Sequence, residues 1–400
     1  MSRIDIKPRI VEDLEKYELY RDKKKTTYTV GSIKKDRFIM ASEKNVDDII
    51  GVYKLFDGEH TIDDIVKIYK DNHKEIDVLK LLNIAEQAGL IENTNKKEVI
   101  LNEFQKYGFS IMDINIGDKL NCIFRRCAHI VSIPFCVFLV AIILIATVLL
   151  PKFGISIVKL NVYNLFDSVF ISIIISTVIT TICVLLHEMA HAIVAAHYRL
   201  IPQKVSISIY LFTPIIYITI PGIYTLPRKQ RILVHAAGII MNAFIFSVSV
   251  MFLPFSFGTL REIMLLIAFN NLGLIVMNLV PFLPLDGYFI LTNILKIPNL
   301  RRISGKKIIS IIRGEKRKLV EYIIYNIISV IFVSLVSISI VIQIIYNFSL
   351  GVNSRGGVLG GIIEIRGYLL IIIIMCISKI LSSNCLLYTS PSPRDYAASR

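Results

Sequence analysis

Hydrophobic residues are distributed unevenly along the chain. From residue 129 onward they gather into apolar stretches, most of them near the twenty or so residues that cross a bilayer core. Residues 1–110 instead mix charged and apolar positions as a soluble domain does, and residues 111–128 are predicted to link the two parts. The apolar stretches predict about six membrane spans: Ile130–Leu150, Ser168–Leu186, Ile232–Leu253, Ile263–Leu283, Tyr322–Tyr346 and a shorter Tyr368–Ile380.

The N-terminal part contains a short β pattern followed by three helical ones. Thr27–Gly31 and Arg37–Ser42 are predicted to be strands. The first helix, VDDIIGVYKLF, follows Asn45 as its N-cap, and the second, TIDDIVKIYK, has Thr61 as its N-cap. The third, IDVLKLLNIAEQAGLI, is expected to end at Gly89. The fold is therefore predicted to be mainly α: a polytopic α-helical membrane protein with an N-terminal cytoplasmic winged-helix-like domain.

The segments LFDGEHTIDDIV and AGLI carry a resemblance. Over roughly residues 5–95 the chain resembles PqqD-like domains, which hold the leader segment of ribosomally made peptides during modification. The resemblance implies peptide docking, while docking of another protein partner and DNA binding stay open. Up to Ala128 the chain has 23 Lys and Arg against 23 Asp and Glu, and its longest basic run is Lys23–Lys25. Nucleic acid is therefore not expected as a partner.

Composition and charge agree with a membrane protein. The chain is 54% hydrophobic and 19% charged, and its net charge of +14 comes entirely from the residues after Ala128. The 296–318 loop holds nine Lys and Arg against the single acid Glu315, which predicts a cytoplasmic loop. Counting spans back from this loop places the N-terminal domain in the cytoplasm, and no secretory signal precedes the first span. A multi-pass protein of the cell membrane, in contact with the lipid bilayer, is expected.

The stretch LLHEMAHAIVA places ionisable residues inside a predicted span. His187 and His191 are four residues apart, so on a helix they share one face and can coordinate one metal ion. Glu188 lies beside them and can accept or donate a proton. A hydrolytic zinc site usually takes three protein ligands and keeps one position open for water. The remaining candidates for the third ligand are His235 and Asp286.

Depth in the membrane favours Asp286 over His235. The second span reaches His187 about twenty residues after its start, and the fourth reaches Asp286 after about twenty-four, both moving inward. An acidic residue at membrane depth is a candidate functional group by default. Between these spans Val205–Leu211 alternates apolar and polar positions. It is predicted to be a strand or re-entrant hairpin, which either pairs with an extended substrate or packs within the protein.

Three motifs on successive spans together resemble the site-2 protease family of intramembrane zinc metalloproteases. They are HEMAH, AAGIIMN (Ala236–Asn242) and NLVPFLPLDGY (Asn278–Tyr288), and the resemblance covers roughly residues 168–295. It implies His187, His191 and Asp286 as zinc ligands and Glu188 as the catalytic acid and base. Substrate-handling positions implied by the motifs are Asn278, Asn242 and Gly238. The sequence departs from the family at Tyr288, where a second glycine is frequent, and no PDZ-like domain interrupts the chain.

The expected function follows from both resemblances. Residues 129–380 are expected to form a transmembrane metalloprotease domain with Zn²⁺ as cofactor. It would hydrolyse a peptide bond in a membrane-associated peptide or protein, in the maturation or export of a ribosomally made peptide, with a peptide exporter as a candidate partner. The alternatives are regulated intramembrane proteolysis of a signalling protein and a non-catalytic accessory role in a peptide exporter. Residues 381–400 form a Ser- and Pro-rich tail that resembles a translated adapter read, and no function is assigned to them.

Overall fold

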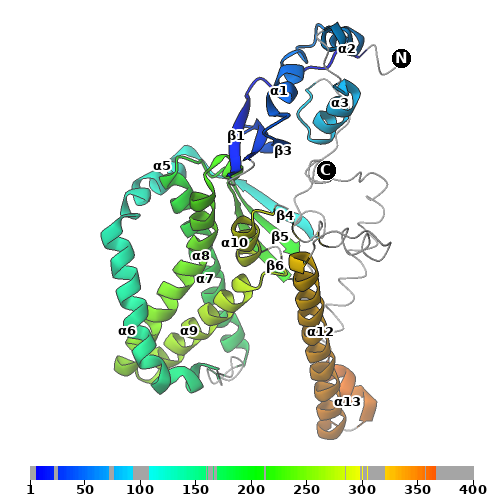
Figure 1. The fold of residues 1–400 in the computed structure, drawn as a ribbon. Helices are drawn as coiled ribbons and strands as arrows, with labels where there is room; N and C mark the ends of the chain where they lie inside the picture. The colour runs from blue at the N-terminus through cyan, green and yellow to red at the C-terminus, as the bar shows by residue number, and fades with distance from the viewer. Residues whose placement is uncertain are drawn as a thin grey trace.

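A computed structural model gives the fold. It describes residues 6–21, 26–71, 76–92, 108–158, 160, 165, 169–210, 213–283, 285–297, 300, 304, 320–355 and 357–365. The protein is mainly helical, with a small sheet at its N-terminus and a second sheet beside the long helices (Figure 1). The sixth predicted span, most of the basic 296–318 loop and the tail lie outside the described residues.

The N-terminal domain consists of three strands followed by three helices. Strands β1 (Leu14–Arg21), β2 (Thr26–Ser32) and β3 (Arg37–Ser42) form an antiparallel sheet in chain order. Helix α1 (Val46–Lys54) packs against β2 and β3, and α1 and α2 (Ile62–Asp71) pack against α3 (Val78–Gln87). A buried apolar cluster that includes Val52, Phe56 and Leu82 lies among these elements. Two strands and three helices were predicted, and β1 is additional. The winged-helix likeness stays a prediction.

The helix starts show which capping predictions hold. Thr61 caps α2 as predicted: its Oγ1 accepts from the backbone N–H of Asp64 at 3.2 Å, and Asp64 Oδ2 accepts from the N–H of Thr61 at 3.0 Å. This reciprocal pair satisfies two N–H groups that a helix start leaves unpaired. Asn45 is the N-cap residue of α1 as predicted, although its side chain makes no cap hydrogen bond. Gly89 follows α3 with a φ of +66°, a left-handed conformation that glycine adopts at little cost.

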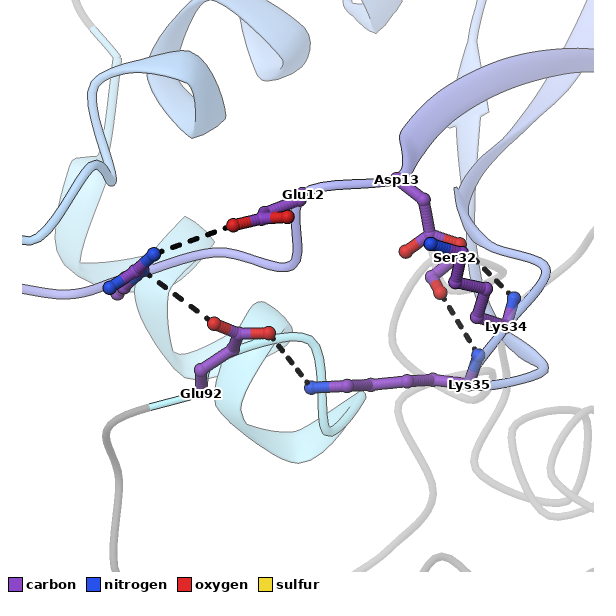
Figure 2. A network of polar contacts seen from close by, with 7 residues as sticks. Glu12, Asp13, Ser32, Lys34, Lys35 and Glu92 are labelled. Carbon is purple, nitrogen blue, oxygen red and sulfur yellow. Dashed lines mark hydrogen bonds and ion pairs between the residues drawn. The ribbon is translucent and has the colours of Figure 1, made fainter.

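A polar network ties the ends of the N-terminal domain together. Glu92 pairs with Arg9 at 3.6 Å and with Lys35 at 3.4 Å, while Asp13 accepts from the backbone N–H of Lys34 at 3.1 Å (Figure 2). The charged partners are largely exposed, so each pair contributes little to stability. The network links the β2–β3 turn to the segments before β1 and after α3.

The membrane part follows the predicted spans closely. Helices α6 (Ile133–Val158), α7 (Val169–His197), α8 (Arg228–Phe252) and α9 (Gly258–Leu279) correspond to the first four. Among the described residues, four helices are long and apolar enough to cross a membrane, and they lie in these elements. The fifth predicted span lies within α12 (Val320–Arg355). Shorter elements are α5 (Asp118–Cys127), α10 (Asp286–Leu295), α13 (Gly357–Glu364), and 3₁₀ turns at Ala128–Ile130, Ile223–Thr225 and Leu253–Phe255.

Helix α8 is the central element of this bundle. It packs against α6, α7, α9 and α10, and its C-terminal end shares an apolar cluster with α6 and α9 around Val250, Leu253 and Leu265. A helix in this position must be buried on several faces, and the buried residues of α8 include the small or polar Ala237, Gly238, Asn242 and Ser249. Small residues let neighbouring backbones approach closely within a membrane bundle.

A three-stranded antiparallel sheet lies beside the bundle. Strands β5 (Lys204–Tyr210) and β6 (Thr213–Thr219) form the hairpin predicted between the second and third spans, and β4 (Gly108–Asn115) pairs with β5 on the other side. The predicted linker 111–128 thus contains most of β4 and all of α5. Since the strand order is β4–β5–β6, the sheet places β6 at an edge.

Candidate metal centre

Helix α7 supplies two buried imidazoles. His187 is 5% exposed and His191 is 8% exposed, and their ring centroids lie 4.8 Å apart. Because the two residues are separated by one helical turn, both rings leave α7 on the same face. Their Nε2 atoms approach to 3.1 Å. The pairing predicted from HEMAH is therefore present, with both Nε2 atoms directed at one point.

The third donor arrives from another helix. Asp286 is the first residue of α10, and its Oδ2 lies 3.1 Å from His187 Nε2 and 3.2 Å from His191 Nε2. This buried oxygen makes no hydrogen bond to any described group. The three atoms thus form a nearly equilateral triangle.

The tautomer of His191 is fixed by α8. Its Nδ1 lies 2.7 Å from the backbone oxygen of Val234. A carbonyl oxygen can only accept, so Nδ1 carries the proton and Nε2 presents a lone pair to the triangle. A backbone carbonyl behind a histidine is a common arrangement for a metal ligand, because it orients the ring and raises its basicity.

Asn242 performs the same task for His187. The side-chain amide of this fully buried residue lies 2.8 Å from His187 Nδ1, and its Oδ1 atom is otherwise without a partner. Amide nitrogen and oxygen exchange places on a half-turn of the side chain. We assign the oxygen to the position beside Nδ1, because it then accepts the Nδ1 proton and the orphaned acceptor is satisfied. His187 Nε2 is then also a lone-pair donor.

These atoms fit a divalent cation. With both Nδ1 atoms protonated, two nitrogen lone pairs and a carboxylate oxygen face one another at 3.1 to 3.2 Å, an arrangement that is repulsive without a positive charge at its centre. In tetrahedral coordination with bonds of 2.0–2.1 Å, neighbouring ligand atoms are about 3.3 Å apart. Among the described residues, His187, His191 and Asp286 form the group that could hold a metal ion.

Gly238 makes room for the two rings. A Cβ atom at this position of α8 would lie 2.4 Å from His187 Cε1, His187 Nε2 and His191 Nε2. That separation is far inside van der Waals contact, so only glycine lets α8 pass this close to the ligands. Gly238 and Asn242, to which the family resemblance gave a role in handling substrate, both contact the histidines.

Glu188 lies between the metal group and the sheet. Its Oε2 accepts from the backbone N–H of Ile218 in β6 at 2.9 Å. Since this N–H donates to α7, it is directed away from β5 and toward the centre. The carboxylate therefore sits next to both histidines on α7 and against the edge strand.

The remaining predicted positions have other contacts. Asn278 donates through its side chain to the carbonyl of Leu274 in its own helix at 3.0 Å, so its predicted role with substrate stays a prediction. Its backbone oxygen lies 2.6 Å from the place where a Cβ on Gly287 would be, so Gly287 lets α10 begin directly against the end of α9. His235 stacks on Phe289 with centroids 5.0 Å apart and is not in the metal group.

The positioning groups that sequence reasoning missed are backbone atoms. Val234 contributes a carbonyl and Ile218 an N–H, and neither has a side chain that signals the role, because every residue except proline carries both groups. Comparison with protein-family models, with curated proteins and with solved structures gave no match for this chain.

Proposed function

We propose that the protein is an intramembrane zinc metalloprotease. The observation that supports this most is the convergence of two histidine nitrogens and an aspartate oxygen from separate helices, with a glutamate beside them. His187, His191 and Asp286 would hold the ion, a donor set of two nitrogens and one oxygen that suits Zn²⁺. Zinc bound there would activate a water molecule and polarise a peptide carbonyl.

Glu188 moves the proton in this proposal. Its Oε2 is held by the Ile218 N–H, which leaves Oε1 to take a proton from the attacking water and return it to the leaving amine. The burial of the histidines limits bulk water at the reacting atoms, which strengthens the electrostatic interactions there. Asn242 and the Val234 carbonyl keep both rings in the ligand tautomer throughout.

The edge of β6 is where we place the substrate. An extended peptide that paired with the rest of this edge would lie beside Glu188, because the Ile218 N–H on the same edge is bonded to that carboxylate. Pairing also suits the chemistry, since a helical substrate keeps its carbonyls in internal hydrogen bonds and must be extended before cleavage.

The N-terminal domain suggests which class of substrate the protein takes. Its resemblance to PqqD-like domains supports recruitment of a ribosomally made peptide for maturation or export. We place the protein in the cell membrane with this domain in the cytoplasm, near a peptide exporter.

Cleavage by the full-length protein in detergent, loaded with zinc, tests the proposal. The probe is a transmembrane peptide with a fluorophore and a quencher at its two ends. The wild type is expected to cleave it, and Glu188→Gln is expected to keep its zinc and lose cleavage, because the amide cannot take the proton. A wild type that binds zinc and cleaves nothing would favour the accessory role. Full cleavage by Glu188→Gln would remove Glu188 from the mechanism.

A further inference from the structure

A buried arginine joins the N-terminal domain to the membrane helices. Arg231, in the first turns of α8, is 0% exposed, and its guanidinium donates in three directions. Nη2 donates to the carbonyl of Leu19 in β1 at 2.7 Å, Nε to Asn293 Oδ1 in α10 at 2.8 Å, and Nη1 to the carbonyl of Leu226 at 3.0 Å. One side chain thus contacts the N-terminal sheet, α10 and the segment before α8.

Further contacts surround this arginine. The ring of Tyr20 in β1 lies over its guanidinium, with 5.0 Å from Cζ to the ring centroid. Lys296, directly after α10, donates to the carbonyl of Arg21 at 3.0 Å, and Asp36 accepts from the N–H of Gly222 at 3.1 Å. The end of β1 therefore meets the segment before α8 (Figure 1). Nη1 also lies 3.5 Å from the carbonyl oxygen of Tyr224, and among the described residues all four of these acceptors of Arg231 are neutral oxygens, so the buried charge is stabilised by their placement.

One face of α8 leads from Arg231 to the metal centre. Val234, whose carbonyl fixes His191, comes one turn after Arg231; Gly238, which abuts both rings, comes about one turn later; and Asn242 follows on the same face. A displacement at Arg231 therefore acts on the same helical face that orients both imidazoles.

Helix α10 connects Arg231 to the third ligand. Asp286 opens this ten-residue helix, and Asn293 lies two turns later on the same face. At its start α10 is fixed by the close approach of Gly287 to the end of α9. At its end Arg228 donates to the carbonyls of Asn293 and Ile294 at 2.7 and 2.8 Å, beside the bond from Arg231. Loss of the bond from Arg231 would therefore loosen the far end of the helix that carries Asp286 at its start.

We infer that Arg231 is a positioning residue that couples docking of the N-terminal domain to the geometry of the metal centre. The inference rests on the metal centre of the proposed function. Metal–ligand distances tolerate changes of only about 0.2 Å, so small movements of α8 and α10 change metal affinity. A peptide or partner that alters the docking of β1 would thereby alter the centre, and a bound metal would favour docking to the same extent.

The test is a double-mutant cycle on the full-length protein in detergent, titrated with Co²⁺ alone. Its dissociation constant and visible absorption spectrum report the ligand geometry without any cleavage. Tyr20 lies outside the metal centre, and Tyr20→Ala removes the aromatic ring that lies over the Arg231 guanidinium. We expect Tyr20→Ala to weaken Co²⁺ binding about fivefold and Arg231→Met about tenfold, with altered spectra. In the double variant Tyr20→Ala should add nothing, because its effect passes through Arg231.

Matched variants separate coupling from general damage. Tyr20→Phe keeps the ring and loses only the hydroxyl that bonds to Arg231, so it should weaken Co²⁺ binding less than Tyr20→Ala does. Lys16→Ala, also in β1, removes the ion pair with Asp47 and the contact with the Tyr28 ring, both inside the domain, and should have no effect on Co²⁺ binding. Arg231→Lys replaces Arg231→Met if the latter does not fold, since lysine keeps the charge but cannot make three bonds in the same directions.

A tryptophan reporter gives the reciprocal measurement. The chain contains no tryptophan, so an introduced one would be the sole tryptophan reporter. The rings of Tyr224 and Phe38 face each other across the interface, with their centroids 6.4 Å apart. In a Tyr224→Trp background, Co²⁺ should change the fluorescence when Arg231 is present and leave it unchanged in Arg231→Met.

The outcomes distinguish the two proposals. Wild-type Co²⁺ affinity and spectrum in folded Tyr20→Ala, or additive effects in the double variant, would overturn the coupling whatever the cleavage assay shows. The predicted cycle together with an absence of peptide cleavage would support the coupling and overturn the proposed protease. A wild-type chain that binds no Co²⁺ would overturn both.

Discussion

Gly238→Ala tests most directly whether α8 packs against the two histidine rings of the metal centre. The added Cβ would lie 2.4 Å from three ring atoms of His187 and His191, where ordinary contact begins at about 3.5 Å. The rings or α8 must therefore move by about 1 Å, several times the tolerance of about 0.2 Å in metal–ligand distances. We expect metal affinity to fall by about 100-fold or more, which corresponds to about 2.7 kcal/mol.

The effect on folding should be much smaller. Alanine gains about 1 kcal/mol over glycine inside a helix, while overpacking a core costs about 1–3 kcal/mol. The two contributions partly cancel, so the metal-free variant should unfold at nearly the wild-type temperature. Loss of metal binding with little loss of stability is the pattern that the geometry predicts.

The control is the same substitution in open space. Gly273 in α9 has no atom within 4 Å of the position of an added Cβ, so Gly273→Ala should bind metal as the wild type does. The assay is a competition titration of zinc against a chromophoric chelator in detergent, with thermal unfolding of the metal-free protein alongside. Wild-type zinc affinity in Gly238→Ala would refute the proposed packing of α8 against the ligands.

Two further predictions concern hydrogen bonds behind the centre and in the N-terminal domain. Asn242→Ala removes the acceptor of the His187 Nδ1 proton and should weaken zinc binding about 10- to 100-fold. Asn278→Ala, whose side chain bonds within its own helix, should leave zinc affinity unchanged. Equal affinities in the two variants, measured by the same titration, would contradict the assignment of Asn242 as the partner of His187. The backbone N–H groups of Glu59 and His60 lower the pKa of the Asp57 carboxyl to about 2. Because the pKa of Asp57 is lower in the folded state, its ionised carboxylate stabilises the fold at pH values above the unfolded-state pKa of about 4. This contribution is lost as the pH falls from about 4 to about 2. Asp57→Ala should therefore unfold at a lower temperature than the wild type at pH 7, with a difference that narrows below pH 4; a difference independent of pH would contradict this.

Sequence periodicity found the elements whose pattern is regular. The four long apolar helices and the α2 cap at Thr61 follow from local rules, and the depth argument already favoured Asp286 as the partner of the two histidines. The missed strands β1 and β4 share a physical cause. Each has a register shift, at Glu18/Tyr20 and at Ser110/Met112, which breaks the alternation by which a strand is recognised.

Contacts between segments far apart in the sequence could not be predicted from local patterns. The carbonyl of Val234 and the N–H of Ile218 take their roles from the packing of α7 against α8 and β6, which no local pattern encodes. Arg231 gave no signal because it lies among basic residues at the start of a span, where an arginine usually faces water or lipid headgroups. Its complete burial becomes visible only when β1 and α10 are placed around it.

The central claim is that one metal ion is shared between α7 and α10. X-ray absorption spectroscopy of the zinc-loaded full-length protein, compared with zinc content in Asp286→Asn, tests it most directly. We expect one zinc per chain, with two imidazole nitrogens and oxygen ligands at about 2.0–2.1 Å, and a marked loss of zinc in Asp286→Asn. A chain that binds no zinc, a sulfur ligand, or an unchanged spectrum in Asp286→Asn would contradict it.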